Sequence, residues 1–142
     1  MIENIRHTGI VVSDLKRSLI FYRDLLGFKI IKQMDEGGQY LDMVLGLEKT
    51  KVTTIKMSAP NGEMIELLFY FSPGGEKKVS EMCDVGISHI AFSVKDLDAT
   101  YEKLIQTGIE FISTPQISPD GFARVAFCKA PEGTFVELVQ EL

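Results

Sequence analysis

Apolar and polar residues alternate along several short segments, and the same series of segments occurs twice. In the first half the alternation predicts strands over residues 5–12, 28–32, 52–57 and 64–71. In the second half it predicts strands over residues 87–94, 109–113, 122–128 and 134–140. The two halves are therefore predicted to be modules of the same kind.

A helix is predicted after the first strand of each half. Ser13 or Asp14 can cap a helix that runs to about Leu26, and Asp96 can cap a second helix that ends near Gly108. Apolar residues recur at steps of three and four along both helices, which predicts one buried stripe on each. The stripes are Leu15, Leu19, Tyr22 and Leu26 in the first helix, and Leu97, Tyr101, Leu104 and Ile105 in the second.

The remaining segments are predicted to be connections. A turn is expected at residues 35–38, before the segment 39–45, and a loop at residues 115–121. Residues 72–86 are rich in Ser, Pro, Gly, Glu and Lys, as linkers are. The sequence thus predicts an α+β domain of two tandem β-α-β-β-β modules, residues 1–71 and 87–142, joined by the linker 72–86.

A single glutamate interrupts the last strand of each module. A Pro-x-Gly turn precedes both strands, and Glu66 and Glu137 stand at the same place after it. Period two puts apolar neighbours on both faces of these strands, so both carboxylates are predicted to be buried. A buried carboxylate is costly unless it is paired, protonated or bound to a metal, so the two need a common explanation.

The only two histidines of the chain occupy a second repeated position, at the first strand of each module. His7 and His89 are 82 residues apart and the glutamates 71 (66 to 137), so the first module carries 11 extra residues, expected around 33–58. Two imidazoles and two carboxylates related by a pseudo-twofold axis are a ligand set for one divalent ion, such as nickel, cobalt, zinc, manganese or iron(II). A purely structural metal is the weaker alternative, because structural sites usually prefer cysteine and a closed geometry.

Composition narrows the partners and the location. A net charge of −5 without a Lys/Arg cluster disfavours nucleic acid and anionic membranes. With neither a long apolar run nor a signal peptide ahead of the first strand, a cytoplasmic location is expected. Cys83 and Cys128 lack CxxC spacing, which predicts reduced thiols, one at the surface and one buried, and no thiolate metal site.

The repeated motifs resemble the vicinal oxygen chelate superfamily, which contains glyoxalase I, methylmalonyl-CoA epimerase, extradiol dioxygenases and antibiotic-resistance proteins. The resemblance covers essentially the whole chain. It rests on the openings His7-Thr8-Gly9 and His89-Ile90-Ala91, on Phe-Tyr-Arg-Asp-Leu-Leu-Gly-Phe at 21–28, and on the paired Glu-Leu endings. It implies a cupped mixed sheet that holds the metal at its bottom, a small-molecule substrate, and usually a homodimer.

By this resemblance the metal ligands are His7, Glu66, His89 and Glu137, the set most similar to the glyoxalase I and epimerase branches. Extradiol-type iron(II) dioxygenases use two histidines and one glutamate, so Glu66 argues against that alternative. Resistance proteins that sequester a drug or metabolite without turnover lack the ligands altogether. Val11 and Tyr70 stand where glutathione-dependent glyoxalases often have arginine and asparagine, which weakens the case for glutathione, and no obvious basic cluster supports coenzyme A.

The resemblance and the ligand set imply proton transfer beside a carbonyl group. An octahedral metal with two open positions would bind two neighbouring oxygens of the substrate and stabilise an enolate or enediolate. Glu137 or Glu66 would take the proton and return it to the neighbouring carbon or the opposite face, giving lyase, isomerase or epimerase activity. Arg124 could reach a substrate carboxylate or phosphate, and Tyr40 and Tyr70 could line the pocket, although solvent exposure or packing explains each of them as well.

Overall fold

Each half of the chain forms its own four-stranded mixed sheet. The computed structural model describes residues 1–142, with one unit at Met1–Lys77 and the other at Lys78–Leu142. The first unit contains β1 (Thr8–Val11), α1 (Leu15–Leu19), the π-helix η1 (Ile20–Leu25), β2 (Lys29–Gly37), α2 (Gln39–Leu45), β3 (Lys51–Ser58) and β4 (Met64–Ser72). The second contains β5 (His89–Ser93), α3 (Leu97–Gln106), β6 (Gln116–Ile117), β7 (Ala123–Lys129) and β8 (Phe135–Glu141).

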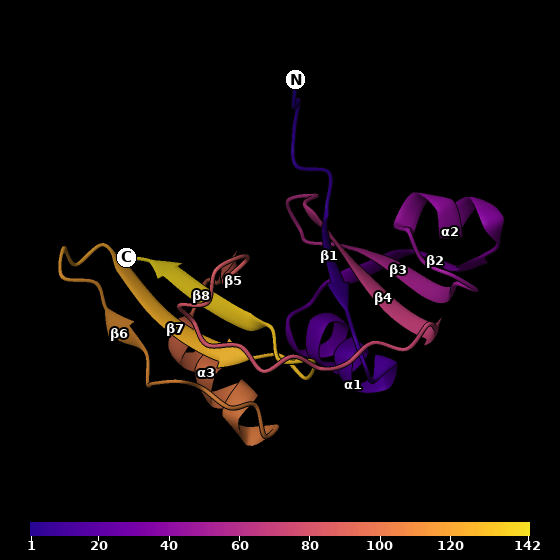
Figure 1. The fold of residues 1–142 in the computed structure, drawn as a ribbon. Helices are drawn as coiled ribbons and strands as arrows, with labels where there is room; N and C mark the ends of the chain where they lie inside the picture. The colour runs from indigo at the N-terminus through magenta and orange to yellow at the C-terminus, as the bar shows by residue number, and fades with distance from the viewer. The chain divides into compact units, whose positions relative to one another are not determined.

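The two sheets have the same topology (Figure 1). Their strand orders are β1-β4-β3-β2 and β5-β8-β7-β6. In each sheet the first strand runs parallel to the last strand of the unit, and the remaining pairs are antiparallel. This arrangement confirms the predicted α+β class and places the histidine strand of each unit directly beside its glutamate strand.

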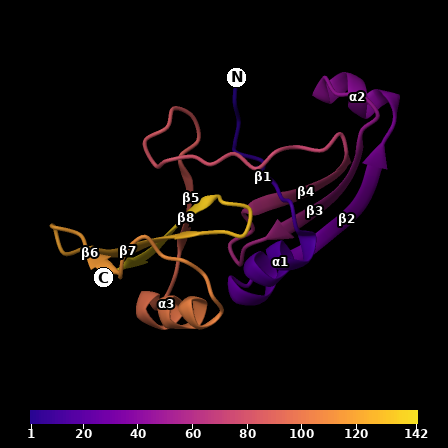
Figure 2. The ribbon, with the colours of Figure 1, turned by 60° about the horizontal axis from the view of Figure 1, so that its bottom comes forward.

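The helix starts are as predicted. The Asp14 carboxylate accepts a hydrogen bond from the Arg17 amide at 3.0 Å, and Asp96 accepts one from the Ala99 amide at the same distance. In the second unit α3 packs on β7 and β8, and Gln140 of β8 accepts a hydrogen bond from the Leu97 amide at 2.8 Å (Figure 2). No helix is long and apolar enough to cross a membrane.

The first helix departs from the predicted regular stripe because its second half is the π-helix η1. A π-turn holds more residues than an α-turn, so the side chains after it rotate out of phase with a 3.6-residue period. Phe21 and Tyr22, adjacent in sequence, are consequently both buried, whereas Leu15, Leu19 and Leu26 are only half-buried. In α3 the prediction holds for Leu97 and Leu104, which are fully buried, and is wrong for Ile105, which is exposed.

Each unit has an apolar core on one face of its sheet. In the first unit the buried strand residues of that face are Ile10, Ile55, Met57, Ile65 and Leu67. In the second unit they are Ala126, Cys128, Val136 and Leu138. Since strand side chains alternate between faces, Glu66 and Glu137 point to the opposite face of their sheets.

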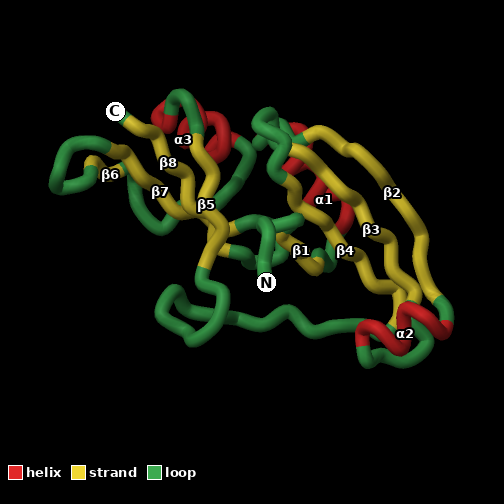
Figure 3. The backbone as a smooth tube through the Cα atoms, turned by 90° about the horizontal axis from the view of Figure 1, so that it is seen from above, coloured by secondary structure: helices red, strands yellow, loops and turns green.

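The extra residues of the first unit form a longer strand, β2, which is followed by helix α2 (Figure 3). Strand β2 runs through Gly37, so the turn predicted at residues 35–38 is wrong, and the segment 39–45 is helix α2. The Asp42 carboxylate ties this helix to the next strand by accepting hydrogen bonds from the Lys49 and Thr50 amides at 3.2 and 2.8 Å. Gly37 is required here, because a Cβ at this position would lie 2.6 Å from the Thr50 carbonyl oxygen.

Three other boundaries also differ from the prediction. Strand β1 begins at Thr8, and residues 1–7 have no regular structure. The strand predicted at residues 109–113 is reduced to a single bridge between Phe111 and Cys128. The short strand β6 falls inside the predicted loop 115–121.

Both cysteines are free, with Cys83 exposed and Cys128 fully buried in β7, as predicted. Burial raises the pKa of the Cys128 thiol to about 12, because the charged thiolate loses its hydration in the core. The thiol therefore stays protonated, and unreactive, well above neutral pH.

We predict that only one thiol of the folded protein reacts with Ellman's reagent at pH 8, and that both react in denaturant. A Cys83→Ser variant should show no fast reaction until it unfolds. Because the unfolded thiol ionises at a lower pH than the folded one, the free energy of unfolding should also fall as the pH rises from about 9 towards 12. Rapid labelling of Cys128 in the folded protein would contradict this assignment.

Candidate metal centre

Each unit contains one histidine and glutamate pair. In the first, His7 Nε2 lies 3.0 Å from Glu66 Oε2, and in the second, His89 Nε2 lies 3.0 Å from Glu137 Oε2. The repeat seen in the sequence is thus reproduced in the geometry of the two pairs.

The strand register explains how the pairs form. Gly9 of β1 lies opposite Glu66, and Ala91 of β5 lies opposite Glu137. Each histidine precedes that small residue by two positions and so projects from the same face of the sheet as the glutamate.

The two carboxylates are largely withdrawn from water. The Glu66 side chain is 13% exposed and the Glu137 side chain 21%, so both are half-buried where the sequence predicted full burial. A carboxylate in such surroundings loses hydration, and the imidazole nitrogen 3.0 Å away is its nearest polar partner from a histidine.

The donor atoms fit a transition metal. Two ligands at about 2.1 Å from a metal and at a right angle are about 3.0 Å apart, which is the nitrogen-to-oxygen distance in both pairs. Neutral imidazole and carboxylate suit zinc and its neighbours among the divalent ions. Neither unit by itself gathers three or more His, Cys, Asp or Glu residues, so each offers two ligands.

The surroundings of the two pairs are not alike. The Nδ1 atom of His89 lies 3.1 Å from the Ser88 hydroxyl, and the Phe127 ring meets the imidazole edge-on at 5.2 Å between centroids. Beside Glu66, by contrast, the Lys56 ammonium lies 4.0 Å from the second carboxylate oxygen, Oε1. Outer partners of this kind orient ligands and tune their basicity.

The sequence-based search missed Lys56 and Phe127, although a signal for them exists. Both residues precede the glutamate of their module by ten positions, so they occupy equivalent places in the repeat. The register confirms the equivalence, since Lys56 lies opposite Glu66 and Phe127 opposite Glu137.

The arginine proposed to contact the substrate lies elsewhere. Arg124 points to the helix side of β7, where its guanidinium forms an ion pair with Asp98 of α3. That is the face opposite to Phe127 and Glu137. The structure therefore assigns Arg124 to the attachment of α3, which corrects the substrate-binding role expected from the sequence.

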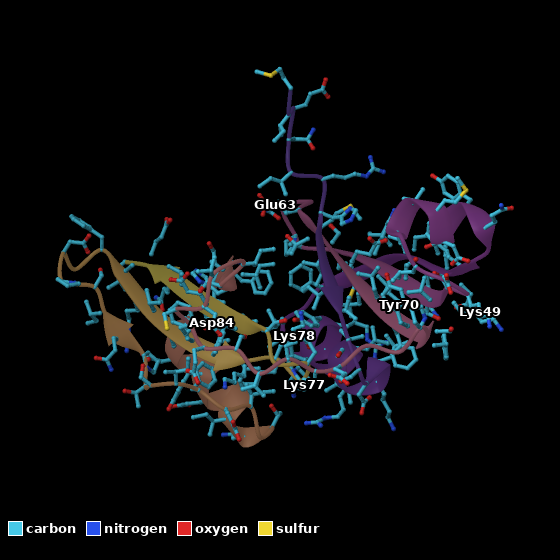
Figure 4. The ribbon with its side chains drawn as sticks, viewed as in Figure 1. Lys49, Glu63, Tyr70, Lys77, Lys78 and Asp84 are labelled. Atoms are coloured by element: carbon cyan, nitrogen blue, oxygen red, sulfur yellow. The ribbon has the colours of Figure 1, made fainter.

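The two tyrosines have different placements. Tyr40 lies on α2 and is 79% exposed, so nothing in the first unit packs closely on it. Tyr70 is half-buried on β4, four residues after Glu66 and on the same face. Figure 4 shows it near the end of the strand that lies away from Glu63.

Comparisons with known proteins identify the family of the chain. The profile of the Glyoxalase/Bleomycin resistance protein/Dioxygenase superfamily matches residues 4–138. The chain belongs to this superfamily. That result confirms the resemblance seen in the paired motifs of the sequence.

Individual relatives come from several branches of life. The chain is 32% identical to a lactoylglutathione lyase of Pseudomonas aeruginosa, with 94% of this chain and 80% of that protein covered. A glyoxalase family protein from Bacillus cereus has a similar structure, with a TM-score of 0.91, 22% identity, and coverage of 100% of this chain and 96% of that one. The trypanothione-dependent glyoxalase I of Leishmania major has a TM-score of 0.71 at 25% identity, with 98% and 87% covered.

We predict that Arg124→Met lowers the free energy of unfolding by about 1 kcal/mol or less, as expected for a partly exposed ion pair, and leaves metal binding unchanged. The same substitution in an Asp98→Asn background should lower the free energy of unfolding by less, because the ion pair is already broken. Urea unfolding and metal titration measure the two effects. A loss of metal affinity without a loss of stability would contradict the structural role.

Proposed function

We propose that the protein is a metal-dependent, glyoxalase-like enzyme that transfers a proton beside a carbonyl group of a small metabolite, as a lyase, isomerase or epimerase. The observation that supports this best is the pair of matched His–Glu contacts at 3.0 Å, one in each unit. The similarity to a lactoylglutathione lyase supports the same class of reaction.

In this proposal His7, Glu66, His89 and Glu137 together hold one divalent ion, which is nickel, cobalt, zinc, manganese or iron(II). The ion would polarise two neighbouring oxygens of the substrate and so make the adjoining carbon more acidic. The four side chains would hold the ion, and the ion would supply Lewis-acid chemistry at the substrate. Cys128 takes no part, because it lies in the core of the second unit.

The remaining chemistry belongs to the glutamates. In each glutamate the Oε2 atom contacts a histidine, so the Oε1 atom would be the one to accept a proton from carbon. For Glu66 that oxygen faces the Lys56 ammonium, whereas Glu137 has the Phe127 ring opposite it. An ammonium competes for the oxygen and an aromatic ring does not, which favours Glu137 as the base.

Two other functions are less well supported. An iron(II) ring-cleaving dioxygenase would need the position of Glu66 open, but Glu66 pairs with His7 as Glu137 does with His89. A protein that only sequesters a drug or metabolite would have no use for matched ligand pairs. The homodimer and the cytoplasmic location stay predictions.

We predict about one transition metal per chain when the protein is purified without a chelating resin, measured by elemental analysis. The variants His7→Ala, Glu66→Ala and Glu137→Ala should each lose most of it, because removal of one ligand leaves three. Tyr40→Ala, on the exposed helix α2, is the matched control and should retain the metal. Absence of metal even after incubation with nickel, cobalt, zinc and manganese would contradict the proposal.

We further predict that Glu137→Gln slows exchange of carbon-bound protons by about 10²-fold or more, the usual contribution of a general base. Exchange into a panel of α-hydroxycarbonyl compounds in D₂O is followed by NMR, with metal content measured alongside. Glu63→Gln, in the turn before β4, is the matched control, since this side chain is exposed (Figure 4). Full exchange in Glu137→Gln with loss in Glu66→Gln would assign the base to Glu66 instead.

A further inference from the structure

The two glutamates differ most in their cross-strand neighbours. Lys56 of β3 lies opposite Glu66, and Phe127 of β7 lies opposite Glu137, on the face that carries each His–Glu pair. An otherwise repeated structure thus has an ammonium group at one site and an aromatic ring at the equivalent one.

The difference extends to the next strand. Lys32 of β2 lies opposite Lys56, so the first unit has a row of Lys32, Lys56 and Glu66 across three strands. In the second unit the Ile112 amide donates a hydrogen bond to the Phe127 carbonyl at 2.9 Å, next to the bridge between Phe111 and Cys128. The equivalent row in the second unit is therefore Ile112, Phe127 and Glu137, in which the two residues beside the glutamate are apolar.

The pairing of Lys32 with Lys56 is unfavourable by itself. Like charges directly opposite each other on neighbouring strands destabilise a sheet. Lys56 is only 26% exposed, so water solvates it incompletely, and its nearest carboxylate oxygen is 4.0 Å away on a glutamate that also contacts His7. Glu36, on the same face of β2, is engaged by the Thr54 hydroxyl at 2.8 Å.

The net charge of the chain is −5, so an overall excess of basic residues does not account for two lysines on neighbouring strands. A bound anion would explain them. It would gain charge-assisted hydrogen bonds from Lys56 and Lys32 beside the His7–Glu66 pair of the first unit.

We propose that Lys56, together with Lys32, forms an anion subsite and that the substrate of this enzyme carries a carboxylate or phosphate group bound there. The inference rests on the proposed function, because it places the anionic group next to Glu66 and its metal. Lys56 is then a specificity-determining residue, and the substrate is an anionic carbonyl compound whose charge lies on the side of the first unit.

The first experiment needs no metal. The metal-free protein is titrated separately with malonate and with inorganic phosphate, and lysine side-chain and backbone signals are followed by NMR. We expect saturable shifts centred on Lys32 and Lys56 with one of the two anions, which identifies the preferred group. Lys56→Met should weaken that binding about tenfold or more, the usual worth of a charged hydrogen bond.

Two further variants keep this test decisive. Lys56→Arg retains the charge and should retain binding, which shows that a loss in Lys56→Met is not a folding defect. Lys51→Met, at the exposed start of the same strand, is the matched control and should bind as the wild type does. Absence of saturable shifts with either anion, or unchanged binding in Lys56→Met, would overturn the inference.

The second experiment uses metal-loaded protein and two chelators, acetohydroxamate and the monohydroxamate of succinic acid, which carries an additional carboxymethyl group. If malonate is the preferred anion, the wild type should prefer the carboxylated chelator about tenfold or more, and Lys56→Met should lose that preference while its affinity for acetohydroxamate stays the same. Equal weakening of both chelators would mean that Lys56 only holds Glu66 in place, and would overturn the inference.

The two experiments also separate this inference from the proposed function. A protein that binds the anion at Lys56 but takes up no metal contradicts the metal-dependent function and supports the subsite. A protein that takes up metal and binds acetohydroxamate, but shows no saturable binding of malonate or phosphate at Lys56, supports the function and overturns the subsite.

Discussion

The contact between a strand glutamate and the imidazole of the neighbouring parallel strand is the constraint on which both units depend. A carboxylate that is 13% or 21% exposed needs a partner, and in each unit the register supplies a histidine two residues before the residue opposite the glutamate. The β-α-β-β-β topology is what brings the first strand beside the last. The fold and the candidate metal centre are therefore consequences of the same strand pairing.

Much of this arrangement could be predicted because the chain repeats itself. One buried glutamate in a strand has many explanations, but Glu66 and Glu137 at equivalent positions, each with a histidine, have few. The caps at Asp14 and Asp96 were predictable for a local reason, since a short polar side chain before an apolar period satisfies the first amides of a helix.

The other features of the structure could not be predicted, because they depend on contacts between residues that are far apart in the sequence. Residues 39–45 are too short for their helical period to be recognised, and η1 breaks the period of the helix before it. Residues 109–113 have the pattern of a strand, yet only Phe111 finds a bridging partner. Arg124 was misassigned because its place beside a loop said nothing of Asp98, which lies 26 residues earlier on α3. A lysine such as Lys56 reads as solvent-facing until the register sets it against Glu66.

A duplicated scaffold gives two equivalent glutamates, whereas a directional proton transfer needs them to differ. The difference lies one strand away from each pair, where the first unit has Lys56 and the second has Phe127. In the proposed mechanism the Lys56 ammonium would draw an anionic substrate towards Glu66, and the Phe127 ring would leave the second oxygen of Glu137 free to accept the proton. Substitution at a single position of the repeat thus gives two otherwise equivalent glutamates different neighbours.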